Sequence, residues 1–391
     1  MDNFTKNDSL NIEFYIKFIE PFESQKKLEK YIMYCVVILF SFIIIIGFFG
    51  NLCVIIIASR KKMVNSTNTL IIGLAYSDLM FLIFCVPITA ITYISQIWIL
   101  PIWTCKLVYY LQHTSAYSSV WTLTLMACDR YLAVCFPIWS ISIRNSKNAF
   151  LALIITYSII LISQIHVASG HGIYHYNFIF ENRSTCGMEK IAYGTASLIE
   201  TRVYYFSFNI FGYLIPLTIT CILYFYMLRR LWKHSTRHFS RRFLKRKNGI
   251  IKINYESFKA RKKATKLILM VVILWAICWL PFNIVLMLSG VVYPNTITQL
   301  WGKFATICTV GAQILAYANS CLNPILYALI SESYKKGFIK IIVYILKIGQ
   351  LSPTKWCISQ LNDISIVDIS KDRSINLNAN SRNRPSCTSY R

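Results

Sequence analysis

The chain has 391 residues, of which 55% are hydrophobic, and it carries a formal net charge of +25 from 41 Lys and Arg against 16 Asp and Glu. A soluble domain is usually about 45–50% apolar, so this composition argues against an ordinary soluble globular protein. The basic residues lie in alternate loops between apolar runs. Membrane topology therefore accounts for the charge, and we set nucleic-acid binding aside.

The predicted elements follow one another along the chain as apolar spans. Residues 1–30 mix acidic, basic and polar side chains without an apolar run, so they are not a secretory signal. Seven stretches then exceed the roughly 20 residues that a helix needs to cross a bilayer. They lie at 31–59, 67–95, 102–136, 148–170, 198–229, 262–292 and 299–329, and an amphipathic stretch follows at 332–346.

The fold class follows from the behaviour of the backbone inside a bilayer. Peptide groups there must hydrogen-bond to one another, so helices are expected. We predict an all-α membrane protein, a seven-transmembrane helix bundle with a short amphipathic eighth helix, over residues 31–346. Residues 1–30 are expected to be an extracellular N-terminus. Residues 347–391, which are polar and poor in apolar clusters, are expected to be a disordered cytoplasmic tail.

The loops predict the orientation of the bundle. Basic residues gather at 60–62, 144–147, 228–266 and 335–340, whereas 96–101 and 293–298 carry no charge. The positive-inside rule then places the N-terminus outside the cell and the C-terminus in the cytoplasm, as in a multi-pass plasma-membrane protein. Three glycosylation sequons fall on the outer side, at Asn3, Asn7 and Asn182.

Asp78 is an isolated carboxylate in the middle of the second span. In a low dielectric such a group is either protonated or paired with a cation and hydrogen-bond donors. It therefore either joins helices as a neutral acid or, as we favour, binds Na⁺ in a small polar chamber. No other cofactor is expected. The chamber residues are Asn51, Asp78, Ser119, Asn319, Ser320 and Asn323.

Two further features lie in the spans. Asp129, Arg130 and Tyr131 end the third span, where neighbouring acid and base can form a charge-assisted pair. Four prolines lie deep in spans and predict kinks, because proline removes a backbone hydrogen bond. They are Pro87, Pro216, Pro281 and Pro324.

Together these motifs resemble the rhodopsin-like (class A) G-protein-coupled receptors over about residues 31–346. The resemblance rests on segments that occur in order on the expected helices. They are Gly50-Asn51, Leu74–Asp78, Asp129–Tyr131, Pro216 with Tyr224, Cys278–Pro281 and Asn323–Tyr327. The chain is thus expected to be a receptor and not an enzyme.

The resemblance implies a disulfide between Cys105 and Cys186 and a mechanism of activation. A shift at Trp279 and Pro281 would swing the sixth span outward and free Arg130 from Asp129. Thr265 would bond Arg130 at rest. The expected switch residues are Asp129, Arg130, Tyr131, Tyr224, Trp279, Pro281, Asn323, Pro324 and Tyr327. The implied partners are a heterotrimeric G protein, arrestin, a receptor kinase and membrane lipid, with no nucleic acid.

The ligand is expected to be an extracellular peptide. Amine receptors place an acid where this chain has Gln112, and opsins place a lysine where it has Tyr317. Short segments such as Lys62–Asn68 and Ala116–Val120 look like the allatostatin-A and galanin receptors. The expected ligand-binding residues are Tyr93, Trp98, Tyr109, Gln112, His113, Tyr117, Phe282 and Trp301.

Other interpretations stay open beside this one. Another peptide or a non-amine small molecule is the alternative within the family. A transporter or channel is the alternative from another class, although the two halves of the chain show no repeat. The chain departs from the family pattern at two positions. Tyr157 stands in the fourth span where the family usually has Trp, and Trp275 stands where a Phe usually packs beneath Pro216. The second lies at a contact that is thought to relay the signal.

Overall fold

The computed structural model describes residues 19–95, 97–178, 181–242 and 250–350. The sequons at Asn3 and Asn7 and the tail beyond residue 350 lie outside the described residues. The chain divides into two compact units, Met1–Phe338 and Ile339–Arg391. The described part of the second unit is the final stretch of one helix, and the remaining elements belong to the first.

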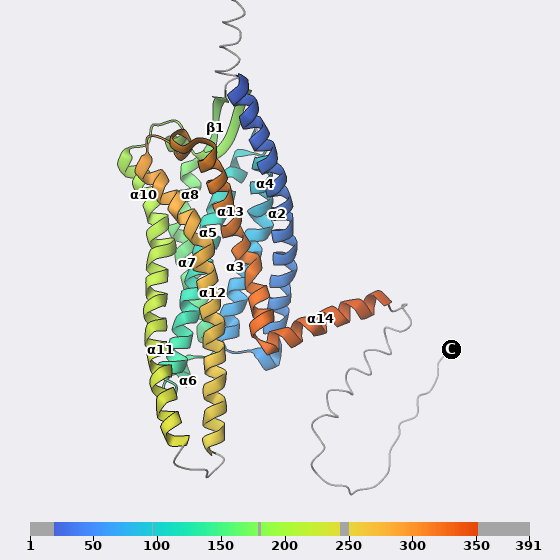
Figure 1. Ribbon diagram of the computed structural model, residues 1–391, viewed down its shortest axis with the longest axis vertical. Coiled ribbons are helices and arrows are strands. Elements are labelled where there is room, and N and C mark those ends of the chain that lie inside the picture. The colour runs from blue at the N-terminus through green and yellow to red at the C-terminus, as the bar shows by residue number, and fades with distance from the viewer. Residues whose placement is uncertain (1–18, 96, 179–180, 243–249, 351–391) are drawn as a thin grey trace, which may run out of the picture. The chain divides into compact units, whose positions relative to one another are not determined.

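Long helices account for most of the described chain, and in the first unit they run alongside one another (Figure 1). The helices are α2 (Glu20–Ala58), α3 (Ser66–Phe84), α4 (Val86–Ile94), α5 (Ile102–Cys135), α7 (Ser146–Ser163), α8 (Ile165–Gly170), α10 (Leu198–Asn209), α11 (Ile215–Arg242), α12 (Ile250–Val292), α13 (Ile297–Ile330) and α14 (Glu332–Gln350). Short turns of helix lie at η2 (Lys61–Met63), α6 (Ser140–Ile143), α9 (Glu189–Ala192) and the π-helical η3 (Ile210–Leu214).

Local sequence sets several helix ends. The Asn65 side chain accepts from the Asn68 N–H at 2.9 Å and caps α3, and Asn145 caps α7 in the same way. Thr296 begins α13 with a reciprocal capping box that uses Gln299. These side chains satisfy N–H groups that the first turn of a helix leaves free, so they fix where each helix begins.

Six helical segments of the described chain are long and apolar enough to cross a membrane by length and composition. They correspond to the first, second, fourth, fifth, sixth and seventh predicted spans. The third, α5, is long enough at 34 residues but carries many polar side chains. It packs against α3, α7, α11 and α12, so neighbouring helices and not lipid surround much of it. A helix in that position does not need an apolar surface all round.

The hairpin of β1 (His171–Phe178) and β2 (Glu181–Met188) is an element that the sequence did not predict. The two strands pair antiparallel, with His171 opposite Met188 and Ile173 opposite Cys186. The hairpin lies at the end of the bundle where α2 begins (Figure 1). α2 itself starts at Glu20, eleven residues before the predicted span, so its first turns reach the hairpin.

The core of the bundle lies between α2, α3, α5 and α13. Phe40, Leu82 and Tyr317 are buried there, and Phe40 stacks on Tyr317 with ring centroids 5.2 Å apart. Gly50 allows α2 and α13 to approach closely, because a Cβ at this position would lie 2.9 Å from the Pro324 side chain. The glycine of the Gly50-Asn51 motif therefore has a packing reason.

Candidate functional site

A cavity of about 690 Å³ opens near the hairpin, and it has the size of a typical ligand site. Residues of α4, α5, α10, α12 and α13 form its walls, and Thr185–Met188 of β2 cover part of it. Phe81, Trp279 and Phe282 are among the apolar side chains that line it. The hairpin and helices that are far apart in sequence therefore build one cavity.

Most of the predicted ligand-binding residues line this cavity. They are Tyr93, Trp98, Tyr109, Gln112, His113 and Phe282. Two do not. Tyr117 packs against Phe208 with ring centroids 5.6 Å apart and donates its hydroxyl to the Ser207 carbonyl at 3.3 Å. Trp301 is 47% exposed near the start of α13. Ligand binding by all eight stays a prediction.

A chain of hydrogen bonds orders the polar wall of the cavity. The Tyr93 hydroxyl donates to Gln313 Oε1 at 2.5 Å, and Gln313 Nε2 donates to the Tyr317 hydroxyl at 3.0 Å. Gln112 Nε2 donates to the same hydroxyl at 3.1 Å and to Thr89 Oγ1 at 2.9 Å. Gln112 is thus an amide within a neutral network that links α4, α5 and α13.

The opposite wall is aromatic, and sequence reasoning missed several of its members. The His171 ring stacks on Tyr109 at 4.2 Å between centroids, and His171 Nε2 lies 3.3 Å from the Tyr204 hydroxyl. Phe208 meets His113 edge-on at 5.2 Å. The cluster Tyr204, Tyr205 and Phe206 in the fifth span was the available signal. His171 offered none, since only the hairpin brings it to the cavity.

A disulfide and a backbone contact hold the hairpin over the cavity. Cys105 at the start of α5 is bonded to Cys186 in β2, with their Cα atoms 5.7 Å apart. The Tyr109 hydroxyl donates to the Cys186 carbonyl at 3.2 Å, and the Trp98 N–H donates to the Ser184 carbonyl at 3.0 Å. β2 is therefore fixed both to α5 and to the segment before it.

An ion cluster joins the hairpin to the beginning of α2. The Arg183 guanidinium donates to both carboxylate oxygens of Glu29 at 3.1 Å and to Glu181 at 2.9 Å. It also lies 4.1 Å from the centre of the Phe178 ring. Lys26 pairs with Glu181, and Lys26 and Arg183 together hold the pKa of that carboxyl below its usual value. The predicted sequon residue Asn182 lies between Glu181 and Arg183 and is exposed.

The predicted hinge lies in a cluster of rings that line the cavity. Trp279 packs against Phe282 at 6.0 Å and Phe208 at 6.4 Å between centroids. Pro281 lies inside α12. One turn below, Trp275 packs on Tyr213 at 5.2 Å, and the Tyr213 hydroxyl donates to the Ala276 carbonyl at 2.9 Å. The π-helical η3 carries Tyr213, so α12 and the fifth span are linked at this level.

The predicted polar chamber is fully buried. Asp78 Oδ2 accepts from Asn323 Nδ2 at 2.9 Å, and Asp78 Oδ1 accepts from the Ser119 hydroxyl at 3.4 Å. Asn51 Nδ2 donates to the Ser320 carbonyl at 2.9 Å. The side-chain oxygens of Asn319 and Asn323 have no hydrogen-bond partner among the described residues. One carboxylate, a hydroxyl and free amide oxygens form a donor set that suits a hard cation.

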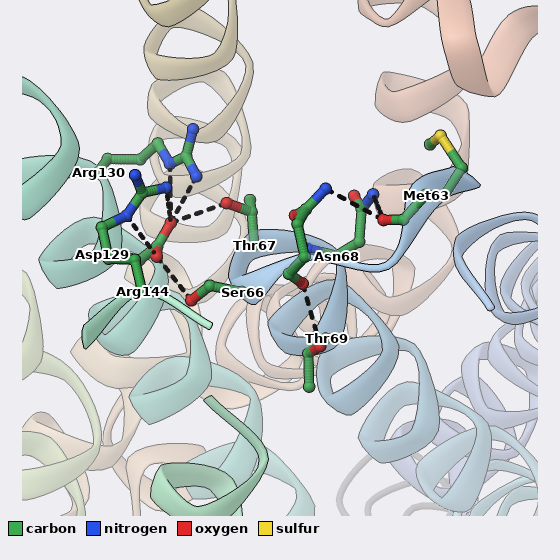
Figure 2. A network of polar contacts seen from close by, with 9 residues as sticks. Met63, Ser66, Thr67, Asn68, Thr69, Asp129, Arg130 and Arg144 are labelled. Carbon is green, nitrogen blue, oxygen red and sulfur yellow. Dashed lines mark hydrogen bonds and ion pairs between the residues drawn. The ribbon is translucent and has the colours of Figure 1, made fainter. Parts of the chain in front are cut away.

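Asp129 is the centre of the polar network at the opposite end of the bundle (Figure 2). It accepts from Arg130 Nη2 at 2.5 Å and Arg144 Nε at 2.9 Å. The hydroxyls of Ser66 and Thr67 donate to it at 2.7 Å each. The carboxylate is therefore shared by two guanidinium groups and two hydroxyls from three segments. Sequence reasoning foresaw only the Arg130 contact.

Three tyrosines complete the predicted switch. The hydroxyls of Tyr224 and Tyr327 are buried and have no hydrogen-bond partner among the described residues. The same holds for Thr265, so the predicted resting bond from Thr265 to Arg130 is wrong in this structure, where Asp129 takes the guanidinium. Tyr131 packs against Phe136 at 5.8 Å. Arg130 is thus held by Asp129, with free tyrosine hydroxyls buried elsewhere in the same bundle.

Comparison with known proteins agrees with these features. The family model "7 transmembrane receptor (rhodopsin family)" matches residues 50–327. The chain is 48% identical over 325 residues to the galanin-like G-protein coupled receptor npr-9 of Caenorhabditis elegans, covering 82% of this chain and 75% of that protein. It is 38% identical to the allatostatin-A receptor of Bombyx mori, covering 82% of each chain. It is 30% identical to the human galanin receptor type 1, covering 81% of this chain and 84% of that receptor.

The match spans the Gly50-Asn51 motif, the buried Asp78, the Asp129–Arg130 pair and Pro324 on the last long helix. These residues lie in a bundle of membrane-crossing helices that has a cavity at one end and the charged Asp129 network at the other. The chain is a multi-pass membrane protein that belongs to the rhodopsin family of seven-transmembrane G-protein-coupled receptors.

Proposed function

We propose that this receptor lies in the plasma membrane with its N-terminus outside, binds a neuropeptide of the galanin or allatostatin-A type, and activates a heterotrimeric G protein. The names of its relatives and the charge pattern of its loops support this proposal. The cavity near the hairpin would hold the peptide. The Asp129–Arg130 end would face the cytoplasm and receive the G protein.

The charge of the cavity is the observation that carries the ligand class. None of the described lining residues is Asp, Glu, Lys or Arg. A monoamine or a free peptide carboxylate would therefore lose its hydration without gaining a counter-ion. Aromatic rings and the amides of Gln112 and Gln313 suit apolar side chains and peptide groups. We infer that the inserted part of the peptide is uncharged, as an amidated end would be.

Activation would couple the two ends of the bundle. A peptide that packs against Phe282 and Trp279 would shift α12 about Pro281. Arg130 would then exchange Asp129 for the buried hydroxyls of Tyr224 and Tyr327, which lack partners here. The peptide drives this change only to the extent that it binds the open arrangement more tightly.

The chamber around Asp78 would bind Na⁺. Asp78, Ser119 and the free amide oxygen of Asn319 would be its ligands, with Asn51, Ser320 and Asn323 around them. Bound Na⁺ would neutralise the carboxylate and hold α3, α5 and α13 in the resting arrangement. A cation that favours the resting state must weaken agonist binding, because the two equilibria are linked.

Arrestin, a receptor kinase and membrane lipid complete the proposed set of partners. The Ser and Thr residues of the tail beyond residue 350, outside the described residues, would be the kinase substrate. Phosphate groups added there would supply charge that basic groups of arrestin can pair with.

G-protein activation in cells that express the full chain tests the proposed function. Cells would be challenged with amidated allatostatin-A-type peptides, galanin and the free-acid form of each active peptide. We expect nucleotide exchange in response to an amidated peptide and a much weaker response to its free acid. Equal potency of the two forms would contradict the uncharged-end inference. An ion current or solute flux without nucleotide exchange would favour a channel or transporter and sink the proposal.

A further inference from the structure

A second large cavity lies on the membrane-facing side of the bundle, away from the peptide cavity. It is a groove of about 770 Å³ between α2, α3 and α7, and neither the proposed ligand nor the switch uses it. Its floor is fixed by Tyr157, whose hydroxyl donates to the Gly73 carbonyl at 2.9 Å and lies 3.0 Å from Thr122 Oγ1. α7 packs closely there, because a Cβ on Gly73 would lie 2.8 Å from Leu153.

The groove changes character along its length. Ser59, Thr69 and Ser146 line one end, where α2 ends and α3 and α7 begin, and Thr69 Oγ1 lies 2.7 Å from Ser146 Oγ. Beyond them the lining is apolar and includes Ile72 and Ile154. A lipid has the same order of parts, with polar ester groups at the interface and an acyl chain in the hydrocarbon core.

Positive charge gathers at the polar end of the groove. Arg60 and Lys61 follow Ser59 directly, Lys147 follows Ser146, and all three are exposed. Arg144, close by in sequence, is already bound to Asp129. Among the described residues no acid pairs with Arg60, Lys61 or Lys147, and the stretches 59–77 and 131–180 contain no Asp or Glu.

We propose that this groove is a binding site for an anionic glycerophospholipid of the cytoplasmic leaflet. One acyl chain lies along Ile72, Phe150 and Ile154, and the phosphate is held by Arg60, Lys61 and Lys147. The change from a polar to an apolar end along the groove favours a lipid, and the unpaired basic residues favour a negative headgroup. The assignment to the cytoplasmic leaflet rests on the orientation proposed above, but the binding itself does not depend on the peptide.

Native mass spectrometry of the purified full-length receptor tests the proposal. The receptor is titrated with phosphatidylserine, with phosphatidylcholine of the same acyl chains, and with cholesterol. We expect phosphatidylserine to be retained more tightly. Neutralisation by R60Q/K61Q/K147Q should weaken its retention by roughly fivefold for each charge removed and leave phosphatidylcholine unchanged. Ser158→Trp, which fills the exposed apolar part of the groove, should weaken retention of both lipids.

Two matched variants separate the groove from general effects. Lys262→Gln removes an exposed basic residue of α12, and Ile277→Trp enlarges a 58% exposed side chain on the lipid-facing side of the same helix. Both should bind lipid as the unchanged receptor does, and surface expression reports folding in every variant. Unchanged phosphatidylserine retention in R60Q/K61Q/K147Q, or equal losses in the α12 variants, would overturn the proposal. So would retention of cholesterol in place of phosphatidylserine with sensitivity to Ser158→Trp.

Discussion

Arg183 in β2 and Glu29 in α2 form a two-pronged ion pair across 154 residues of chain. The Arg183 side chain is only 4% exposed and also pairs with Glu181, so the hairpin is tied to the first turns of α2. Residues of the same strand line the cavity near the hairpin. The first helix therefore helps to position the strand that covers this cavity, although no described residue of α2 lines it.

Glu29→Gln tests this arrangement, because it keeps the shape of the side chain and removes its charge. We expect peptide affinity to fall by about fivefold, since Arg183 loses one of two charge-assisted partners. Radioligand or fluorescent-peptide binding at constant surface expression measures it. Lys190→Gln, which breaks the exposed Lys190–Glu200 pair, should leave affinity unchanged. An equal loss of affinity in both variants would contradict a specific role of the Glu29–Arg183 pair. The loss would then come from any change of charge on the outer surface.

Removal of the disulfide should also loosen β2, because it breaks the attachment of this strand to α5. Cys105→Ser and Cys186→Ser each remove the covalent link between β2 and α5, and the loss of this constraint costs roughly 2–4 kcal/mol of stability. We expect strongly reduced peptide binding in each variant and no further loss in the double variant. Further loss in the double variant would show that the two sulfurs act separately. Thermal unfolding of the purified receptor with and without peptide distinguishes lost binding from lost folding.

Asp129→Asn should raise ligand-independent signalling. The carboxylate holds both Arg130 and Arg144, and an amide cannot neutralise either guanidinium. Arg144→Gln keeps the Arg130–Asp129 pair and should raise basal nucleotide exchange much less. Basal exchange at matched expression levels measures both variants. If Arg144→Gln proved as active as Asp129→Asn, Arg144 and not Arg130 would be the residue that restrains the receptor.

Asp78→Asn tests the Na⁺ chamber. In the unchanged receptor, agonist affinity should fall by about fivefold or more when NaCl replaces choline chloride, because Na⁺ holds the resting state. The variant lacks the carboxylate, so its agonist affinity should not depend on Na⁺. Competition binding in the two salts measures this. A receptor that ignores Na⁺ before mutation would leave Asp78 as a neutral helix-joining residue.

His171 predicts a dependence of receptor stability on pH. Burial lowers the pKa of its imidazole from 6.5 to about 4. The folded state thus binds fewer protons than the unfolded chain, so the contribution of His171 to stability is complete above pH 6.5. It is lost as the pH falls toward 4. Thermal unfolding of the purified receptor should show stability declining over this window, and less so in His171→Asn. His175→Asn alters an exposed hairpin histidine and should keep the full decline.

Sequence by itself predicted the membrane helices and the contact between Asp129 and Arg130. Apolar length and charge in the loops predict spans without knowledge of their packing, and the seventh-span segment Asn323–Tyr327 is a local pattern. The third span contains many polar residues. It was nevertheless predicted, because it ends in the Asp129–Tyr131 motif and is flanked by loops. The pairing of Asp78 with Ser119 and Asn323 was also expected, because buried carboxylates need donors at the same depth.

The tertiary structure alone decided the parts that depend on distant contacts. The hairpin at 171–188 exists where Cys105, Glu29 and Trp98 hold it, and none of these is near in sequence. The same is true of the second guanidinium on Asp129 and of the His171 face of the cavity. Tyr117 and Trp301, expected in the cavity, are not among its lining residues. Helical period and hydropathy are patterns of residues close together in the chain, so they predict single helices. The positions above are set by packing between distant segments, and the sequence does not show which segments pack together.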